Sequence, residues 1–392
     1  MNARSRVVLV IGLTQTLAWG STYYLPAILA EPIARDLDVS TGSVFGAFSL
    51  ALILTAILGP AAGQRIDSHG GRGMLTVSSL LFCLGLLTLG LSQGPVTLWL
   101  AWSILGVGMA VGLYEAAFAT LAGLYGQKAR GPITAITLMA GFASTIFWPA
   151  TGWLDAEFGW RISCFVWSAV HLLIGLPLNR LLLPKAAQAS TNQIEQALSR
   201  HSPPRFAMPL LALVFAIVWI LSTAMAAHLP RLLQESGLTG AAAIGLAALV
   251  GPAQVAARFL EFSLLSKFHP LVSARLASIA HPVGALAMLL FGAPAALVFT
   301  LLHGAGNGIL TIAKGTLPLI IFGPMGYGQR QGWLMAPARF GQATAPFLFA
   351  LLIEKLGSGA LVVSTALGLL AFGALTLLQY LTRYHHELKN TP

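Results

Sequence analysis

A short polar segment, Gly63-Gln64-Arg65-Ile66-Asp67-Ser68-His69-Gly70-Gly71-Arg72, separates two long apolar runs at residues 41–62 and 73–92. Each run is long enough for a membrane-spanning helix, which needs about 20 apolar residues. Two such runs around so short a break predict a pair of neighbouring helices that cross the bilayer.

The composition extends this prediction to the whole chain. Of the 392 residues, 56% are hydrophobic and 9% are charged, with a mean hydropathy of +0.79. Globular proteins carry about 25% charged residues, so most of this surface must face lipid. We predict an all-α membrane protein with twelve transmembrane helices. The ten other apolar segments lie near 7–29, 96–123, 131–154, 161–183, 206–229, 240–262, 271–291, 295–321, 332–354 and 359–382.

The order of the apolar segments predicts two domains. A polar stretch at 184–205 follows the sixth segment and is predicted to be a cytoplasmic linker. It would join a six-helix bundle at residues 1–183 to a second six-helix bundle at residues 206–392.

Two short motifs recur in both halves. Gly59-Pro60-Ala61 recurs as Gly251-Pro252-Ala253, and Gly106-Val107-Gly108 recurs as Gly304-Ala305-Gly306. The shared offset, roughly 190–200 residues, indicates an internal duplication, with the substrate site at the interface of the repeats.

The basic residues orient the chain. With the N-terminus in the cytoplasm, 15 of the 22 lysines and arginines fall on the cytoplasmic side, four on the opposite side and three within spans. This asymmetry predicts that both termini are cytoplasmic in an inner membrane. The basic residues form no dense run, so we expect no nucleic-acid partner. Cys83 and Cys164 have no metal-ligand spacing, and the chain has no Gly-x-x-x-x-Gly-Lys-Ser/Thr motif, so we expect no metal, cofactor or ATP.

The segment at 63–72 resembles the loop between helices 2 and 3 of the major facilitator superfamily, Gly-x-x-x-Asp-Arg-x-Gly-Arg-Arg. The match comprises Gly63, Asp67, Gly70 and Arg72, while Ser68 replaces a usual basic residue. The resemblance implies a major facilitator fold and a gating role for Gly63, Asp67 and Arg72. Its aspartate would lie at the start of helix 11, where the helix dipole favours an anion. The alternative is a plain polar turn.

Other segments are compared with subgroups of this superfamily. Phe158-Gly159-Trp160-Arg161 is similar to the family pattern before helix 6. Trp102 stands where proton antiporters have an arginine. Trp148-Pro149-Ala150-Thr151-Gly152-Trp153 departs from the exporter pattern Gly-Pro-x-x-Gly-Gly. Both departures argue against a drug antiporter.

The entry to helix 5 resembles a different subgroup. The stretch from Tyr125 to Gly141 is similar to monocarboxylate-porter-like members, and Arg258 matches their helix 8 arginine. Gln254 stands where those members have an acid. The resemblance implies organic-anion chemistry but leaves proton coupling through helix 8 in question.

Ionisable side chains inside spans are the candidate site residues, because each costs roughly 2.5–3.5 kcal/mol at a helix centre. The fold that the resemblance implies lines its cavity with helices 1, 4, 7 and 10. Glu115 on helix 4 is therefore the candidate for proton coupling, since burial favours its protonated form. The sequence leaves a second interpretation open, a fixed ion pair with Lys314 or Arg339.

Three cations predict an anionic substrate. Lys314, Arg258 and Arg339 lie within spans, and arginine can hold a carboxylate through two parallel hydrogen bonds. The alternatives are a pair between Arg258 and Glu261, and a contact of Arg339 with carbonyl groups or Asp67.

Polar side chains complete the predicted substrate site. His303 and Asn307 lie four residues apart on one face of helix 10, and Gln15, Tyr23 and Tyr24 lie on helix 1. Each can instead be a structural polar group. His171 and His281 fall on peripheral helices, so no function is assigned to them.

These residues together predict a monomeric, proton-coupled importer of a small organic anion that works by alternating access. The main alternative is a proton-driven exporter of an amphipathic compound. An intramembrane enzyme would need a nucleophile–base or metal constellation such as His-Glu-x-x-His, which the sequence lacks. A transporter-derived sensor would need a larger soluble domain than the linker and tail provide.

Overall fold

The computed structural model describes residues 2–185 and 204–390, and over these ranges every regular element is a helix. The linker predicted at 184–205 lies outside the described residues except at its ends, as does Arg200 among the predicted cytoplasmic cations. Nine segments in the described chain are long and apolar enough to cross a membrane. Two of them, of 64 and 56 residues, each hold two spans, and the N-terminal helix completes the twelve.

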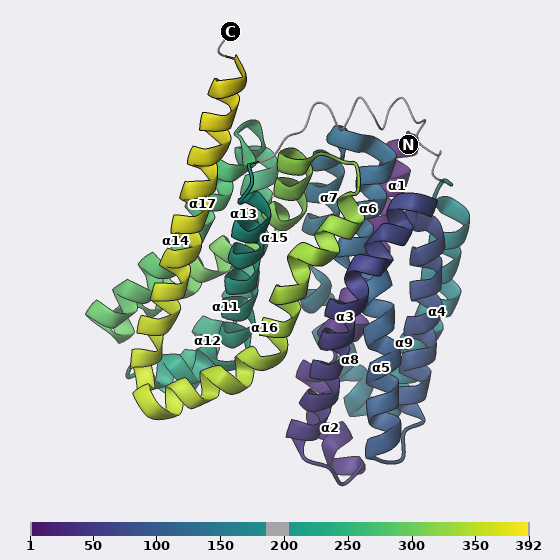
Figure 1. The fold of residues 1–392 in the computed structure, drawn as a ribbon. Coiled ribbons are helices and arrows are strands. Elements are labelled where there is room, and N and C mark those ends of the chain that lie inside the picture. The colour runs from purple at the N-terminus through teal and green to yellow at the C-terminus, as the bar shows by residue number, and fades with distance from the viewer. Residues whose placement is uncertain (1, 186–203, 391–392) are drawn as a thin grey trace. The chain divides into compact units, whose positions relative to one another are not determined.

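The described residues fall into two compact units, and the first contains residues up to 199 together with 323–336. In this unit α3, α4, α5 and α9 pack side by side, while α1 packs on α7 (Figure 1). Its helices are α1 (Ala3–Ala18), α2 (Pro26–Asp36), α3 (Thr41–His69), α4 (Gly71–Gly90), α5 (Pro95–Gly112), α6 (Tyr114–Tyr125), α7 (Arg130–Ala140), α8 (Ala143–Phe158), α9 (Trp160–Val170) and the start of α16 (Tyr327–Leu356).

The second unit contains residues 200–322 and 337–392, of which 204–322 and 337–390 are described. Here α14 packs on both α15 and α17, α13 packs on α15, and α11 packs on α17 (Figure 1). Its helices are α11 (Ala207–Glu235), α12 (Gly240–Ala247), α13 (Val250–Ser263), α14 (Pro270–Phe291), α15 (Ala296–Phe322), the remainder of α16 and α17 (Ala360–Asn390).

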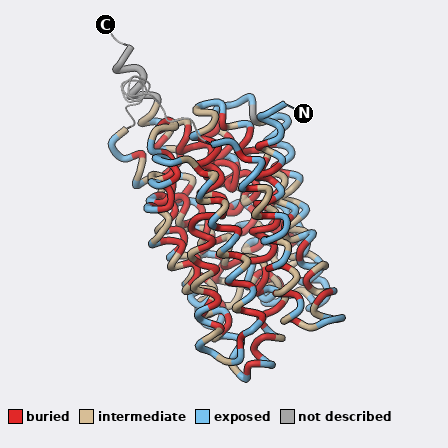
Figure 2. The backbone as a smooth tube through the Cα atoms, turned by 90° about the vertical axis from the view of Figure 1, so that its right-hand side faces the viewer, coloured by how far each residue is buried: buried red, intermediate tan, exposed pale blue. Residues whose placement is uncertain are grey.

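Buried and exposed residues alternate along the helices (Figure 2), as expected when one face packs on neighbours and the other meets lipid. Large apolar side chains remain outside: Val96, Leu173 and Leu181 are 81%, 71% and 72% exposed. In water such a surface would be unfavourable at about 25 cal/mol per Å², whereas a bilayer covers it without that cost. The protein is a multi-pass membrane protein.

The recurring glycines mark the close helix contacts of each unit. A Cβ on Gly106 of α5 would lie 2.6 Å from the Ala51 backbone of α3. A Cβ on Gly304 of α15 would lie 2.7 Å from the Val250 carbonyl of α13, and one on Gly308 would lie 2.5 Å from the Gln254 carbonyl. Only glycine fits at such distances, so the repeated motifs set matching helix contacts in the two halves.

Span four is not the continuous helix that the sequence predicted at 96–123. It ends as α5 at Gly112 and restarts as α6 at Tyr114, with Leu113 extended between them (φ −83°, ψ −166°). Spans one and six also depart from α-helical geometry, at three π-helical segments, Trp19–Tyr23, His171–Gly175 and Leu178–Leu182. Such segments inside helices often occur at functional sites.

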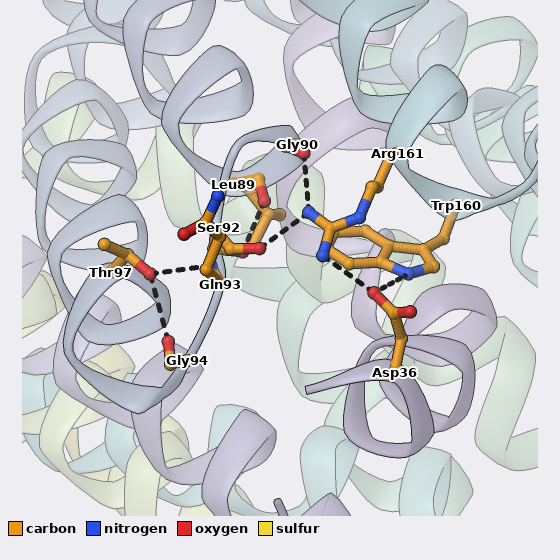
Figure 3. Close-up of polar contacts among 9 residues, drawn as sticks. All are labelled: Asp36, Leu89, Gly90, Ser92, Gln93, Gly94, Thr97, Trp160 and Arg161. Carbon is orange, nitrogen blue, oxygen red and sulfur yellow. Dashed lines mark hydrogen bonds and ion pairs between the residues drawn. The ribbon is translucent and has the colours of Figure 1, made fainter. Parts of the chain in front are cut away.

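The start of α9 is held by a polar cluster around Arg161 (Figure 3). Its guanidinium donates to the carbonyls of Gly90 and Ser92 at 2.9 and 2.6 Å and pairs with the Asp36 carboxylate at 2.7 Å. It also lies 4.4 Å from the ring centroid of Trp160, whose indole donates to the same carboxylate at 3.3 Å. The cluster therefore ties α2, α9 and the α4–α5 turn together.

Candidate functional site

The polar loop at 63–72 meets the start of α16 within the first unit. The Asp67 carboxylate accepts hydrogen bonds from the backbone N–H groups of Gly328 and Gln329, at 2.8 and 2.9 Å. A Cβ on Gly63 would lie 2.0 Å from the Gly328 carbonyl, so only glycine permits this approach. The helix N-terminus offers unpaired N–H groups and a positive dipole end, which suit a carboxylate. This is the position that the resemblance implied for Asp67.

The third predicted gating residue, Arg72, has a different surrounding. It lies half-buried near the start of α4, and its Nε has no hydrogen-bond partner among the described residues. Gly63 and Asp67, both on α3, thus contact the start of α16. Arg72 lies after the turn, on α4.

Glu115 lies in the first turn of α6, directly after the break in span four, and is half-buried. The break exposes helix termini in the middle of a span. Gln15 satisfies one of them, because its side-chain Nε2 donates to the Gly112 carbonyl at 2.6 Å. Leaving such a buried carbonyl unpaired would cost about 1–3 kcal/mol. The new N-terminus also places a favourable dipole beside the Glu115 carboxylate.

An aromatic cluster surrounds this break on the side of helix 1. The ring centroid of Trp19 lies 5.0 Å from that of Tyr23 and 4.8 Å from that of Tyr114, the residue before Glu115. Tyr23 and Tyr24 are half-buried and pack edge to face at 5.5 Å. The two predicted tyrosines therefore belong to the same part of the first unit as the span-four break.

Two buried cations of the second unit are linked to α11, one directly and one through a glutamine. Lys314 of α15 is fully buried, and its Nζ lies 4.5 Å from the ring centroid of Trp219. Arg339 of α16 is 1% exposed and donates to Gln342 Oε1 at 3.1 Å. Gln342 in turn donates to Thr223, at 3.2 Å. Trp219 and Thr223 lie four residues apart, so Lys314 directly and Arg339 through Gln342 are linked to one stripe of α11.

Arg258 occupies a different place from these two cations. It is buried on α13, and its Nε donates to the Gly308 carbonyl of α15 at 3.4 Å. Glu261 is also buried, one turn further along the same helix. Arg258 thus supports the α13–α15 contact that Gly308 makes possible.

His303 and Asn307 line a small cavity in the second unit. The cavity measures about 30 Å³, enough for about two water molecules, and His281 and Ser278 of α14 contribute to its wall. The Nδ1 atoms of His281 and His303 lie 2.9 Å apart, so one imidazole donates to the other. His281 Nε2 has no hydrogen-bond partner among the described residues.

Comparisons with known proteins identify the family. The family model described as Major Facilitator Superfamily matches residues 11–317. The chain belongs to the Major Facilitator Superfamily. It is therefore a transporter by family, with the fold that the sequence predicted, and secondary transport of a small molecule is its general activity.

Relatives within the superfamily differ in what their names state. The chain is 29% identical to an "uncharacterized 38 kDa protein in 23S RNA operon" of Thermoproteus tenax, over 86% of each chain. It is 30% identical to an MFS-type efflux pump of Mycolicibacterium smegmatis, over 42% of this chain and 38% of the pump. It is 25% identical to monocarboxylate transporter 2 of Mus musculus, over 39% of this chain and 32% of that protein.

Solved structures of the superfamily share the fold over almost the whole chain. The human organic anion transporter MFSD10 matches with a TM-score of 0.72 and 17% identity, covering 96% of this chain and 100% of that chain. The proton:xylose symporter XylE matches with a TM-score of 0.75 and 16% identity, covering 96% of each chain. At these identities the likeness shows the fold alone.

Sequence reasoning missed several polar residues of this superfamily member. His281 was given no function, yet it pairs with His303. His171 was also set aside, yet its Nε2 lies 2.8 Å from the Ser21 hydroxyl, and Asn179 on the same span is buried. All lie inside apolar segments, where the cost of burying a polar group marks it as structural or functional. This signal was visible in the sequence, but the histidines were set aside because they lie on helices that the resemblance places at the periphery.

Proposed function

We propose that this transporter moves a small organic anion across the inner membrane by alternating access, in a proton-coupled uptake cycle. The observation that carries the proposal is a pair of buried cations linked to one stripe of α11, Lys314 directly and Arg339 through Gln342. Two positive charges in a low-dielectric environment attract a carboxylate, and an arginine can hold one through two parallel hydrogen bonds.

The proposed binding set has a cationic and a polar part. Lys314 and Arg339 would hold the carboxylate, Arg339 through its fork of N–H donors, while Asn307 and His303 would contact the remainder of the substrate. Tyr23 and Tyr24, on helix 1 of the first unit, stay predicted substrate contacts of that unit. Arg258 would position α13 against α15 through the Gly308 carbonyl. Gln15, whose amide donates to the Gly112 carbonyl, is assigned to a separate ion site in the next subsection.

Glu115 would carry the coupling proton. It lies beside the break in span four, where its carboxylate is stabilised by the α6 N-terminus and destabilised by burial. Asp67 and Gly63, with Arg72 beside them, would gate the cycle through the hydrogen bonds to α16. Both termini would be cytoplasmic, and the protein would work as a monomer.

Two relatives agree with an anionic substrate by name, the mouse monocarboxylate transporter and the human organic anion transporter. The mycobacterial efflux pump supports the second candidate, a proton-driven exporter of an amphipathic compound. Substrate charge separates the two functions.

Ligand-dependent thermal unfolding tests the anion site. Purified wild-type protein and the Lys314→Met variant would be heated with organic anions, cations and neutral amphiphiles, with Lys355→Met as a control because Lys355 is exposed. We expect carboxylates to raise the unfolding temperature of the wild type and the control but not of Lys314→Met. Stabilisation by neutral or cationic amphiphiles alone would refute the anion site and favour the exporter.

Proton coupling needs a separate assay in proteoliposomes. A stabilising carboxylate should drive inward proton movement through the wild type, detected with an internal pH dye. Glu115→Gln should bind that carboxylate but lose the proton signal. Equal proton movement in both proteins would refute the role of Glu115.

A further inference from the structure

The first unit contains a second polar cavity, where the π-helical segments of spans one and six come together. It measures about 10 Å³, which is about the size of one water molecule. The adjacent Ser21–His171 contact joins the π-helical segments Trp19–Tyr23 and His171–Gly175. Six polar residues line the cavity: Thr14, Gln15, Ser78, Ser79, His171 and Asn179.

The hydroxyl groups of this lining present only lone pairs. Thr14 donates its single hydroxyl proton to the Ile11 carbonyl at 3.2 Å. Ser78 and Ser79 both donate to the Leu75 carbonyl, at 2.8 and 3.3 Å. A peptide carbonyl can only accept, so the hydroxyl protons of Thr14 and Ser78 are already used, and Ser79 accepts from Asn179 at 3.0 Å.

The side-chain amides of Gln15 and Asn179 are also oriented by their carbonyl partners, because only the amide nitrogen can donate to a carbonyl. Gln15 Nε2 donates to the Gly112 carbonyl at 2.6 Å. Asn179 Nδ2 donates to the Leu75 carbonyl and to Ser79 Oγ, both at 3.0 Å. Their oxygens, Gln15 Oε1 and Asn179 Oδ1, are buried and have no hydrogen-bond partner among the described residues. Both side chains are at most 3% exposed, so bulk water does not satisfy these oxygens.

The histidine of the lining also presents an acceptor. Ser21 donates its hydroxyl proton to the Leu17 carbonyl at 2.7 Å. The 2.8 Å contact between Ser21 Oγ and His171 Nε2 therefore requires the histidine to donate from Nε2. A neutral imidazole protonated at Nε2 keeps a lone pair on Nδ1.

From this lining of lone pairs we propose that the cavity binds a sodium ion. A water molecule could donate to two of these acceptors, but its own lone pairs would face the others. A cation interacts favourably with all of them, and hard oxygen ligands suit a hard cation. The lining holds no carboxylate, which suits the single positive charge of sodium.

The proposed ion would stabilise the irregular part of the first unit. Gln15 and Gly112 connect the cavity to the break in span four, while His171 and Asn179 connect it to the π-helical segments of span six. Transporters elsewhere use irregular helix segments to coordinate sodium. The inference does not depend on the organic anion or on Glu115, and its test uses neither.

The chain offers a matched pair of glycine variants for this test. A Cβ on Gly175 would lie 3.3 Å from His171 Nδ1 and 3.5 Å from Ser79 Oγ, so Gly175→Ala places a methyl group in the cavity. Gly152→Ala adds the same methyl group on α8, where no described atom of another part of the fold lies within 4 Å. Thr14→Val removes one oxygen ligand while keeping the side-chain shape.

Thermal unfolding of each protein would be measured in sodium, potassium and choline chloride at equal ionic strength, without organic ligand. We expect sodium to raise the wild-type midpoint by about 2 °C or more in a saturable manner. The rise should persist in Gly152→Ala and be lost or require higher sodium in Gly175→Ala and Thr14→Val. Equilibrium binding of radioactive sodium to the wild type should saturate near one ion per chain.

Three results would overturn the proposal: equal midpoints in sodium and choline, equal effects of sodium and potassium, or a full sodium effect in both cavity variants. If Gly175→Ala fails to fold, Thr14→Val and the binding measurement decide alone. Failure of the anion site would leave all of these results unchanged.

Discussion

Replacing Arg161 with methionine should destabilise the first unit measurably, because one guanidinium serves three acceptors (Figure 3). Methionine has a similar length but donates no hydrogen bond. It would remove the Arg161 donor from the Gly90 and Ser92 carbonyls, and the Asp36 carboxylate would keep the Trp160 hydrogen bond but lose its ion pair. The stacking of the guanidinium on Trp160 would also be lost.

The magnitude follows from the exposure of the partners. Hydrogen bonds to charged groups contribute about 1.5–3 kcal/mol each when buried. The Arg161 side chain is 35% exposed and that of Asp36 is 48% exposed, so solvent screening reduces the total. We expect a loss of about 2 kcal/mol, after that screening, in the free energy of unfolding. This corresponds to a fall of about 4–8 °C in the unfolding midpoint.

Arg35→Met provides the matched control. Arg35 pairs with Glu31 at 3.1 Å, four residues earlier on α2, and both side chains are more than three-quarters exposed. Such helical surface pairs contribute about 0.3–0.5 kcal/mol. Both variants would be followed by tryptophan fluorescence at one heating rate in one detergent. Equal midpoint shifts in the two variants would refute the assigned importance of the cluster.

Three further predictions concern single contacts. Gly308→Val should prevent stable folding, because its Cβ would lie 2.5 Å from a backbone carbonyl. Gly373→Val, on open α17 surface, should fold. The yield of folded protein in size-exclusion chromatography compares the two variants. Asp67→Ala should speed hydrogen exchange of the two α16 amides that it binds by roughly 10–100-fold, whereas Ser68→Ala should not. Gln342→Leu should lower the unfolding midpoint by leaving a buried guanidinium without this acceptor, and Gln342→Glu should restore it.

Each of these predictions has a clear contrary result. Normal yield of Gly308→Val would mean that α13 and α15 can separate without loss of the fold. Unchanged exchange in Asp67→Ala would mean that the carboxylate does not protect the start of α16. A midpoint for Gln342→Leu equal to that of the wild type would mean that the Gln342 acceptor contributes nothing to stability.

The membrane fold was predictable because it depends on composition along the chain. Apolar length, the polar breaks and the basic-residue asymmetry are local properties, so they indicate spans without any knowledge of packing. The glycine motifs indicated an internal duplication, and the structure shows matching close helix contacts at Gly106 and Gly304. The segment at 63–72 further predicted the family, and the resemblance placed Asp67 at α16.

The sequence did not predict the break at Leu113, the π-helical segments, or the partners of the buried polar groups. A single extended residue or a π-helical segment leaves the apolar pattern of a span unchanged, so hydropathy cannot detect either one. Likewise, Lys314 is identifiable as a buried cation from sequence, but its contact with Trp219 depends on how α15 and α11 pack. Hydrogen-bond partners such as Gln15 and Gly112 lie 97 residues apart. Hydrophobicity determined which segments enter the membrane, whereas only tertiary packing decided which polar groups meet there, because directional bonds require atoms to lie within about 3 Å.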